Sequence, residues 1–329
     1  MSPAGRRIDW LAPALIVAIA LAGLPAIGSG SSWLTLTVAG LAMGMMIFVM
    51  ASGLSLVFGL MDVMNFAHGA FISVGAYVGV SVLRPLAGWM QADDLLLNTA
   101  AMLVAFAAAA VVGGVLGWAF ERVIVRRVYG DHLKQILITV GGLIVAEQSI
   151  HLVWGPDQIP LPKPAAWRGA VIVGDAALEK YRLLAVALGA VIFVAMQLLL
   201  NRTRLGLLIR AGVEDREMVE AMGYRIGRVF VGVFVAGAAL AGIGGTMWAL
   251  YQEGVTATMG ADLMILIFIV IIVGGLGSVG GCFVAAVLVG LTANYVGYLA
   301  PKVALGSNIL LMMVVLLWRP NGLYPVKKP

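Results

Sequence analysis

Long runs of sequence without a charged side chain constrain the fold of this chain more than any other feature. No Asp, Glu, Lys or Arg occurs within residues 11–61, 95–120, 183–201, 229–252, 263–301 or 303–318. About 20 consecutive apolar residues are enough for one α-helix to cross the hydrocarbon core of a bilayer. Only segments that satisfy their own backbone hydrogen bonds can span that core. The chain is therefore predicted to be an all-α, polytopic transmembrane helix bundle.

Composition agrees with this class and excludes others. Charged residues make up 11% of the chain, against about a quarter of a soluble protein. The net charge of +5 is spread over several loops rather than gathered on one soluble domain, which argues against nucleic-acid binding. Cys282 is the single cysteine, so no disulfide can form within the chain. The first apolar segment leads into further membrane segments and is expected to be retained rather than cleaved.

The apolar runs divide into about 8–10 membrane-embedded segments. They are expected at about residues 11–27, 34–60, 66–83, 95–120, 135–154, 183–200, 229–251 and 263–273, with one more ending near residue 300 and a last one ending at residue 318. The segments at 66–83 and 263–273 are short, so either can be broken or re-entrant instead of crossing fully. The Pro-rich stretch at 155–180 cannot be helical throughout.

Basic side chains set the orientation. If the chain crosses ten times from an inner N-terminus, inner segments carry 15 of the 21 Lys and Arg residues and outer segments carry 6. Lys and Arg are enriched in cytoplasmic loops. Both termini and residues 201–228 are therefore expected in the cytoplasm.

Small residues recur at the spacing that lets membrane helices approach closely. The pairs are Gly40 with Gly44, Gly75 with Gly79, Gly113 with Gly117, and Gly237 with Ala241. Pairs of this kind in separate segments predict a tightly packed bundle.

Residues 201–228 are the longest strongly charged stretch, with six arginines and four carboxylates. A loop this ionic must project into water. Within it, residues 214–222 are predicted to form a short amphipathic helix that Gly223 ends. The residues that can share its apolar side are Val213, Met218, Ala221 and Met222. Either this helix is offered to a soluble partner, or the stretch is a solvated connection.

Two segments interrupt the apolar pattern. Residues 58–71 place Asp62, Asn65 and His68 between two apolar helices. The pattern V-x-G-L-x-x-V occurs at 57–63 and again at 273–279, a weak indication of two related halves. Residues 274–281 read GGLGSVGG, and their candidate helix-breaking residues are Gly274, Gly275, Gly277, Gly280 and Gly281. Broken helices in transporters often lie beside the substrate route.

Polar residues near these breaks are candidates for a translocation pathway. On a helix, Asn65 and His68 would share one face, with Asp62 one turn earlier and Gly69 following. The alternative for His68 is a structural bond from its ring to a backbone carbonyl. A second set is Glu147, Gln148 and His151, in which Glu147 either pairs with His151 four residues on or faces a wet cavity.

The sequence carries no catalytic signature. It has no Gly-x-x-x-x-Gly-Lys-Ser/Thr loop for binding nucleotide phosphates. No Cys, His or carboxylate cluster has the spacing of metal ligands. We therefore expect no enzyme activity, no metal and no cofactor in this chain.

Several blocks of the chain resemble the permease subunits of bacterial branched-chain (hydrophobic) amino-acid ABC importers. They are GLSLVFGLMDVMNFAHGAF at 53–71, the segment 214–223 followed by GAALAGIGG at 237–245, GGLGSVGG at 274–281, and WRPNGLYP at 318–325. The resemblance implies one transmembrane permease domain over residues 1–329 in the bacterial inner membrane. The implied partners are a second permease subunit, two cytoplasmic ATPase subunits that hydrolyse ATP, and a periplasmic substrate-binding protein.

The resemblance also implies that the loop at about 201–228 couples the permease to the ATPases. Its coupling-helix candidates are Glu214, Met218, Glu220, Ala221, Met222 and Gly223. The usual centre of such a loop is Glu-Ala-Ala with Gly three residues later, and Glu220-Ala221-Met222-Gly223 departs from it.

Three functions fit these residues. The first is uptake of branched-chain or other hydrophobic amino acids, and the second is uptake of urea or short amides by an importer of the same build. The third is a stand-alone secondary transporter driven by protons through Glu147 and His151.

The orientation can be tested with introduced cysteines. A cysteine at Ala170 is expected to react with a membrane-impermeant thiol reagent added outside, whereas one at Ala211 is expected to stay unlabelled, because the two positions fall on opposite sides. Labelling of intact cells, with permeabilised cells as the control, measures this. Protection of position 170 in intact cells would contradict the orientation.

Overall fold

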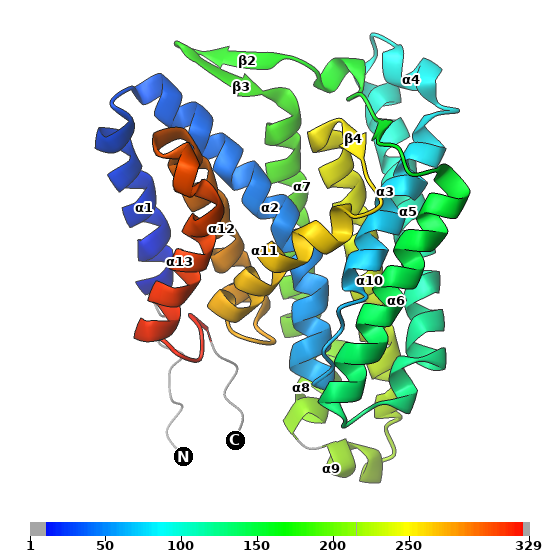
Figure 1. Ribbon diagram of the computed structural model, residues 1–329. Coiled ribbons are helices and arrows are strands. Elements are labelled where there is room, and N and C mark those ends of the chain that lie inside the picture. The colour runs from blue at the N-terminus through cyan, green and yellow to red at the C-terminus, as the bar shows by residue number, and fades with distance from the viewer. Residues whose placement is uncertain (1–10, 215, 325–329) are drawn as a thin grey trace.

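The computed structural model describes residues 11–214 and 216–324 and consists of a helical bundle (Figure 1). Its α-helices are α1 (Leu11–Ile27), α2 (Gly30–Met61), α3 (His68–Leu83), α4 (Ala87–Gln91), α5 (Leu95–Val123), α6 (His132–Trp154), α7 (Lys180–Arg202), α8 (Arg204–Glu214), α9 (Arg216–Ala221), α10 (Ile226–Gln252), α11 (Met259–Gly274), α12 (Val279–Leu299) and α13 (Ala304–Trp318). Short 3-10 turns are η1 (Val125–Arg127), η2 (Ala165–Trp167) and η3 (Pro301–Val303). The prediction of an all-α bundle is confirmed.

Every apolar segment expected from the sequence is a helix. Among the described residues, six helices are long and apolar enough to cross a membrane, namely α2, α5, α6, α7, α10 and α12. Four apolar helices are shorter, at Pro13–Ile27, His68–Leu83, Met259–Gly274 and Gly306–Trp318. The helices α3 and α11 have 16 residues each, and such a helix rises only about 24 Å. Neither reaches the roughly 30 Å of a hydrocarbon core, in agreement with the expectation of broken segments.

The two ends of the bundle differ in the segments that they carry (Figure 1). The β2–β3 hairpin and α4 lie at one end, while α8, α9 and the connection from α5 to α6 lie at the other. Arg126 and Arg127 of η1 therefore share an end with the arginines of the α8–α9 segment, as the base count predicts. Some residues of that count lie outside the described residues, namely Arg6, Arg7, Lys327 and Lys328.

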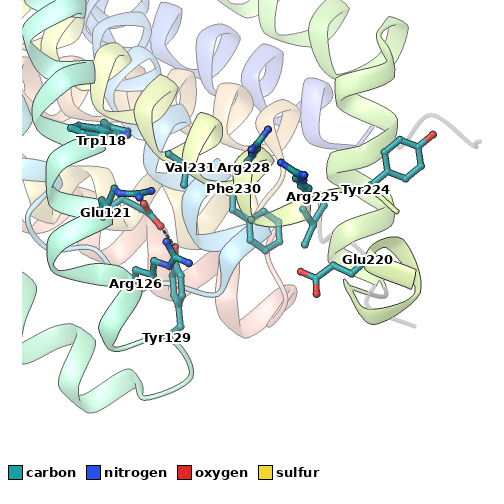
Figure 2. A pocket seen from close by; sticks show the side chains of 13 residues that line it. Trp118, Glu121, Arg126, Tyr129, Glu220, Tyr224, Arg225, Arg228, Phe230 and Val231 are labelled. Carbon is teal, nitrogen blue, oxygen red and sulfur yellow. Dashed lines mark hydrogen bonds between the residues drawn. The ribbon is translucent and has the colours of Figure 1, made fainter. Parts of the chain in front are cut away.

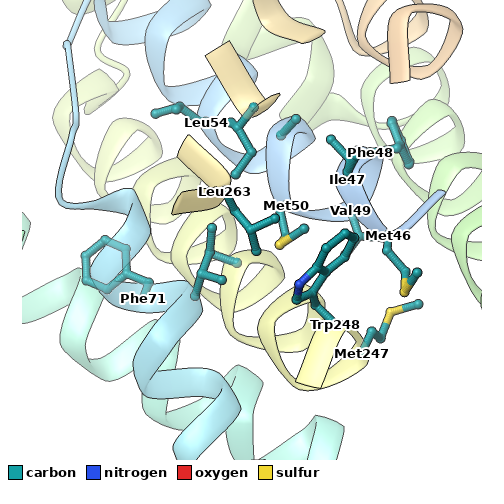
Figure 3. Packing of buried hydrophobic residues seen from close by; sticks show 14 of the residues in the cluster. Met46, Ile47, Phe48, Val49, Met50, Leu54, Phe71, Met247, Trp248 and Leu263 are labelled. Carbon is teal, nitrogen blue, oxygen red and sulfur yellow. The ribbon is translucent and has the colours of Figure 1, made fainter. Parts of the chain in front are cut away.

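The centre of the bundle is α2, which packs against α7, α10 and α12. Its residues Met46 to Met50 are fully buried, and the side chains of Trp248 and Leu263 approach them from α10 and α11 (Figure 3). Phe48 meets the rings of Phe193 and Phe283 edge-on, at centroid distances of 5.7 and 5.6 Å. Burial of such side chains away from the lipid makes α2 the core helix, with α5, α6 and α7 more exposed around it.

Glycines determine how closely these helices pack. A Cβ atom on Gly75 would lie 2.3 Å from Cα of Gly242, and one on Gly53 would lie 2.5 Å from the carbonyl oxygen of Gly237. A Cβ on Gly290 would lie 2.2 Å from the carbonyl oxygen of Gly40. Real side chains do not approach backbone atoms this closely. The predicted role of small residues at helix contacts is therefore confirmed for the α2–α12 and α3–α10 pairs.

The Pro-rich stretch after α6 forms an irregular cap with two small sheets that the sequence did not predict. Strand β1 (Ile159–Pro160) pairs antiparallel with β4 (Gly254–Val255), and β2 (Ala170–Val173) pairs with β3 (Ala176–Glu179). The side chain of Lys163 is nearly buried and forms ion pairs with Glu179 and, at 3.1 Å, with Glu253. A buried charge requires partners of this kind, so the cap is joined to the ends of α7 and α10.

Candidate functional site

The first break differs from the helix that the spacing of its polar residues suggested. Helix α2 ends at Met61, and Asp62 adopts a left-handed conformation with φ +52°. Because residues 62–67 are not helical, Asp62, Asn65 and His68 do not share a helix face, and that expectation was wrong. Asp62 is exposed, with its carboxylate 3.5 Å from Nε2 of His132, whereas Asn65 and His68 are buried.

Two side chains of α6 satisfy the backbone of this break. The N–H of Met64 donates to Oε1 of Gln135 at 3.1 Å, and the N–H of Phe66 donates to Oγ1 of Thr139 at 3.2 Å. Both α6 side chains are buried. Non-helical backbone at membrane depth needs such partners, because neither lipid nor bulk water supplies them. Sequence reasoning missed this pair, although two polar residues four apart in an apolar helix were the available signal.

The ring of His68 forms the bond to a backbone carbonyl that was the alternative to a place in the pathway. Its Nε2 atom lies 2.9 Å from the carbonyl oxygen of Met50 in the middle of α2. This bond holds the first residue of α3 against the core helix. Asn65 is buried beside it, and its Oδ1 atom has no hydrogen-bond partner among the described residues.

The starts of α3 and α11 meet inside the bundle. A Cβ atom on Gly260 would lie only 1.9 Å from the carbonyl oxygen of Gly69. The hydroxyl of Ser73 donates to the carbonyl of Ala257 at 2.8 Å and accepts from the N–H of Gly260 at 2.9 Å. Gly69 was a candidate from the sequence, whereas Ser73 and Gly260 were not. The N-terminal parts of the two short helices α3 and α11 are thereby joined close to the first break.

The second break turns the chain from α11 into α12. Gly275 and Gly277 have φ values of +95° and +80°, a conformation that glycine adopts without strain. Ser278 caps α12 by accepting from the N–H of Gly281 at 3.1 Å. Gly274 and Gly281 are in backbone contact, while Gly280 faces Gln197 of α7. The glycine-rich segment therefore breaks the helix as predicted.

Both breaks are in contact with each other and with the end of the chain. A Cβ on Gly59 would lie 2.0 Å from Cα of Gly277. The N–H groups of Leu323 and Tyr324 donate to the carbonyls of Val273 and Gly274, at 2.8 and 3.0 Å. These carbonyls end α11 and would otherwise lack helical partners. The repeated V-x-G-L-x-x-V pattern does not correspond to a repeated backbone, because Gly59 lies within α2 whereas Gly275 lies beyond α11.

The charged loop contains two helices where the sequence predicted one over residues 214–222. Helix α8 ends at Glu214, and α9 begins at Arg216. The side chains of Val213, Glu214 and Arg216 and all of Asp215 lie outside what the structure describes. Met218, Ala221 and Met222 of the predicted apolar side are exposed, as is Glu220, while Val219 is buried against Ile226 and Phe230.

Gly223 ends α9 as predicted. It has φ +87°, its N–H donates to the carbonyl of Glu220 at 2.9 Å, and the N–H of Tyr224 donates to the carbonyl of Val219 at 3.2 Å. This pair of bonds is a Schellman motif, which needs a left-handed residue at the position of Gly223. The buried side of α9 also packs against Met61, the last residue of α2. The exposed helix is thus attached to the residue that precedes the first break.

The polar set on α6 lies at the side of the bundle. Glu147 is partly buried and Gln148 is exposed, and the structure has no ion pair between Glu147 and His151 among its described residues. Asp262, in the first turn of α11, lies close enough to Glu147 to interact electrostatically. Of the two alternatives for Glu147, the pairing with His151 is therefore not present among the described residues. No group of three or more His, Cys, Asp or Glu residues among those described could hold a metal ion.

Residues 36–318 match the family described as branched-chain amino acid transport system / permease component. The chain belongs to this family. The matched region contains both breaks and the α8–α9 segment, and the resemblance stated from the motifs is confirmed. This permease is a non-catalytic transport subunit and a multi-pass protein of the inner membrane.

Curated relatives cover most of the permease. LivH of Escherichia coli K12, a high-affinity branched-chain amino acid transport system permease protein, is 27% identical over 86% of this chain and 92% of its own. BraD of Pseudomonas aeruginosa, described in the same words, is 28% identical over 86% of this chain and 93% of its own. LivM of E. coli K12 is 26% identical over 87% and 69%. No solved structure matches the permease.

The bonds that hold the first break can be tested at Thr139. Replacing Thr139 with Val keeps the shape of the side chain but leaves the N–H of Phe66 without its acceptor, which typically costs about 1–3 kcal/mol. We expect a lower melting temperature for the purified permease. Thr139→Ser is the matched control, because it retains the hydroxyl. Equal melting temperatures for Thr139→Val and the unchanged protein would contradict the assignment.

Proposed function

We propose that this permease is the membrane-spanning subunit of an ABC importer for branched-chain or other hydrophobic amino acids. The observation that carries the proposal is the family match over residues 36–318, which includes the exposed α9 helix. LivH and BraD, which cover this chain almost end to end, are both named as branched-chain amino acid permeases. The chain itself has no nucleotide-binding loop, so ATP hydrolysis belongs to partner chains.

The proposed assembly contains a second permease, two cytoplasmic ATPase subunits and a periplasmic binding protein. The similarity of this chain to both LivH and LivM, two different permeases named for one transport system in E. coli, supports a partner permease of different sequence. The inner-facing end carries α8 and α9, and the opposite end carries the β2–β3 hairpin. The ATPases would contact the first end and the binding protein the second.

Helix α9 is the proposed coupling helix. Its Met218, Ala221 and Met222 are exposed at the inner end, where an amphipathic helix can dock in a groove of an ATPase subunit. Its buried Val219 packs against Ile226 and Phe230 at the start of α10. A displacement of α9 would therefore move α10 directly.

The same contact offers a route from α9 to the breaks. Met61 packs against the cluster around Val219 and immediately precedes Asp62. Two residues earlier, Gly59 lies against Gly277 of the second break. Nucleotide-driven motion of α9 would thus reach both breaks and shift the bundle between outward and inward access. We place the translocation pathway near Asn65 and Gly69, where the starts of α3 and α11 meet, with His68 positioning α3.

Substrate uptake tests the proposed function. Cells that lack their own branched-chain amino acid uptake and express this permease with its neighbouring transport genes are expected to accumulate labelled leucine. Excess unlabelled isoleucine should compete, and excess urea or acetamide should not. Competition by urea or acetamide alone would assign the importer to amides instead.

Coupling is tested at the docking face of α9. Ala221→Asp places an unpaired charge in a face that the proposal buries against an ATPase, so we expect loss of transport and of ATP hydrolysis stimulated by loaded binding protein. Gly223→Val forces a β-branched residue into a left-handed conformation, which costs roughly 1–2 kcal/mol and displaces α9. Both variants should still insert into the membrane, since neither change lies in a spanning helix.

Ala221→Ser is the matched control for coupling, because it is small and uncharged at the same position. It is expected to retain stimulated hydrolysis. If the purified complex with Ala221→Asp still responded to loaded binding protein, α9 would not be the coupling element.

A further inference from the structure

A cavity of about 740 Å³ opens at the inner end of the bundle, between the end of α5 and the start of α10 (Figure 2). One wall carries Arg122 and Arg126, and the other carries Arg225 and Arg228. All four side chains are exposed, and none forms an ion pair with a carboxylate among the described residues. The position and the charge of this cavity are those of a site for an anion at the inner membrane surface.

The acidic residues of the cavity do not cancel this charge. Four arginines against two carboxylates, Glu121 and Glu220, leave an excess of two positive charges. Glu121 is buried in the wall and accepts a hydrogen bond from the Tyr129 hydroxyl at 2.7 Å, the dashed line in Figure 2. Its carboxylate is therefore already held by the protein, while the four arginine side chains are exposed.

The start of α10 adds the backbone N–H of Gly227 to the same wall, whereas the N–H groups of Ile226 and Arg228 already donate to the carbonyls of Tyr224 and Arg225. Gly227, the second residue of this 27-residue helix, lines the cavity, and no atom lies within 4 Å of the place where its Cβ would be. The N-cap residue Arg225 makes no side-chain capping hydrogen bond. An uncapped helix N-terminus favours a phosphate, and here it stands beside the arginines.

A second, apolar cavity of about 330 Å³ continues from the first along the side of the bundle. Trp118 lines both cavities, and the second is otherwise formed by Ala110, Val111, Gly114, Val115, Val235 and Ala239. Its small residues make the floor of a groove between α5 and α10, while Val111, Val115 and Trp118 are at least half exposed at its edge. A groove of this composition on a membrane helix fits a hydrocarbon chain.

We propose that the two cavities together bind one anionic phospholipid of the inner leaflet. Its phosphate would lie between the four arginines at the start of α10, and one acyl chain would fill the α5–α10 groove beside Trp118. A soluble anion would account for the arginines but leaves the groove unoccupied. A cytoplasmic protein would account for the charge but does not reach the groove, which runs into the spanning part of α5 and α10. A lipid accounts for both the arginines and the groove. It would also link the bilayer to Glu220 of α9 and to Tyr224, which follows α9.

Quenching of Trp118 fluorescence tests this site. The permease, with any partner subunits that purify with it, is reconstituted in vesicles of phosphatidylcholine containing a minor share of phosphatidylglycerol. In one set of vesicles the phosphatidylglycerol carries bromine on its acyl chains, and in the other set an equal mole fraction of the phosphatidylcholine does. The chain has 8 tryptophans, and the difference from a Trp118→Phe variant isolates the fluorescence of Trp118 from that of the others. We expect brominated phosphatidylglycerol to quench Trp118 more strongly than brominated phosphatidylcholine.

Two variants assign this preference to the two cavities. Arg225→Gln combined with Arg228→Gln is expected to lower the preference for phosphatidylglycerol by roughly 30-fold, from about fivefold for each charge removed. The control is Arg127→Gln, an exposed neighbour of Arg126 that does not line the cavity, and it should keep the preference. Ala239→Leu fills the groove and should reduce quenching by both brominated lipids.

Three results would overturn the proposal. Equal quenching by the two lipids would mean that the groove is an ordinary lipid-facing surface. An unchanged preference in the double arginine variant would mean that the lipid phosphate does not bind at Arg225 and Arg228. Loss of the preference on adding inorganic phosphate alone would make the cavity a site for a soluble anion. None of these readouts involves transport, so they stand apart from the test of coupling at Ala221.

Discussion

The rest of the structure depends on one constraint, which is that every backbone polar group at membrane depth needs a partner within the protein. Continuous helices meet it by themselves, but this chain interrupts its helices twice. Gln135 and Thr139 satisfy the interruption after α2, and the backbone of Leu323 and Tyr324 satisfies the end of α11. The helix α6 and the C-terminal segment are therefore part of the two breaks, although both are distant from them in sequence.

Glycine contacts make the interrupted region responsive to its surroundings. Where backbones touch, as at Gly59 with Gly277 and Gly69 with Gly260, no flexible side chain lies between the two segments to absorb a displacement. Packed interfaces of this kind shift between discrete arrangements rather than deform gradually. Because Val219 of α9 packs against both α10 and the end of α2, the exposed helix is in contact with this rigid network.

The two ends of the molecule handle charge in different ways. At the end that carries the β2–β3 hairpin, Lys163 is nearly buried and paired with Glu179 and Glu253, so its charge stabilises the cap. At the end that carries α8 and α9, the arginines around Trp118 remain exposed and outnumber the carboxylates beside them. Paired buried charges fix a structure, whereas unpaired exposed charges attract ligands. The base asymmetry used to predict the orientation thus also supplies the charge of the proposed anion site.

The sequence by itself determined the class of protein, the helices and the positions of the breaks, because length, hydropathy and glycine act locally along the chain. It also predicted the turn at Gly223, since only a left-handed residue ends α9 in this way. Tertiary structure decided which polar groups meet. The spacing of Asp62, Asn65 and His68 suggested one helix face, but residues 62–67 are not helical, and His68 bonds to Met50 of another helix. The pairing of Gln135 and Thr139 with the break, and the groove at Trp118, depend on helices far apart in sequence, whose contacts no local pattern records.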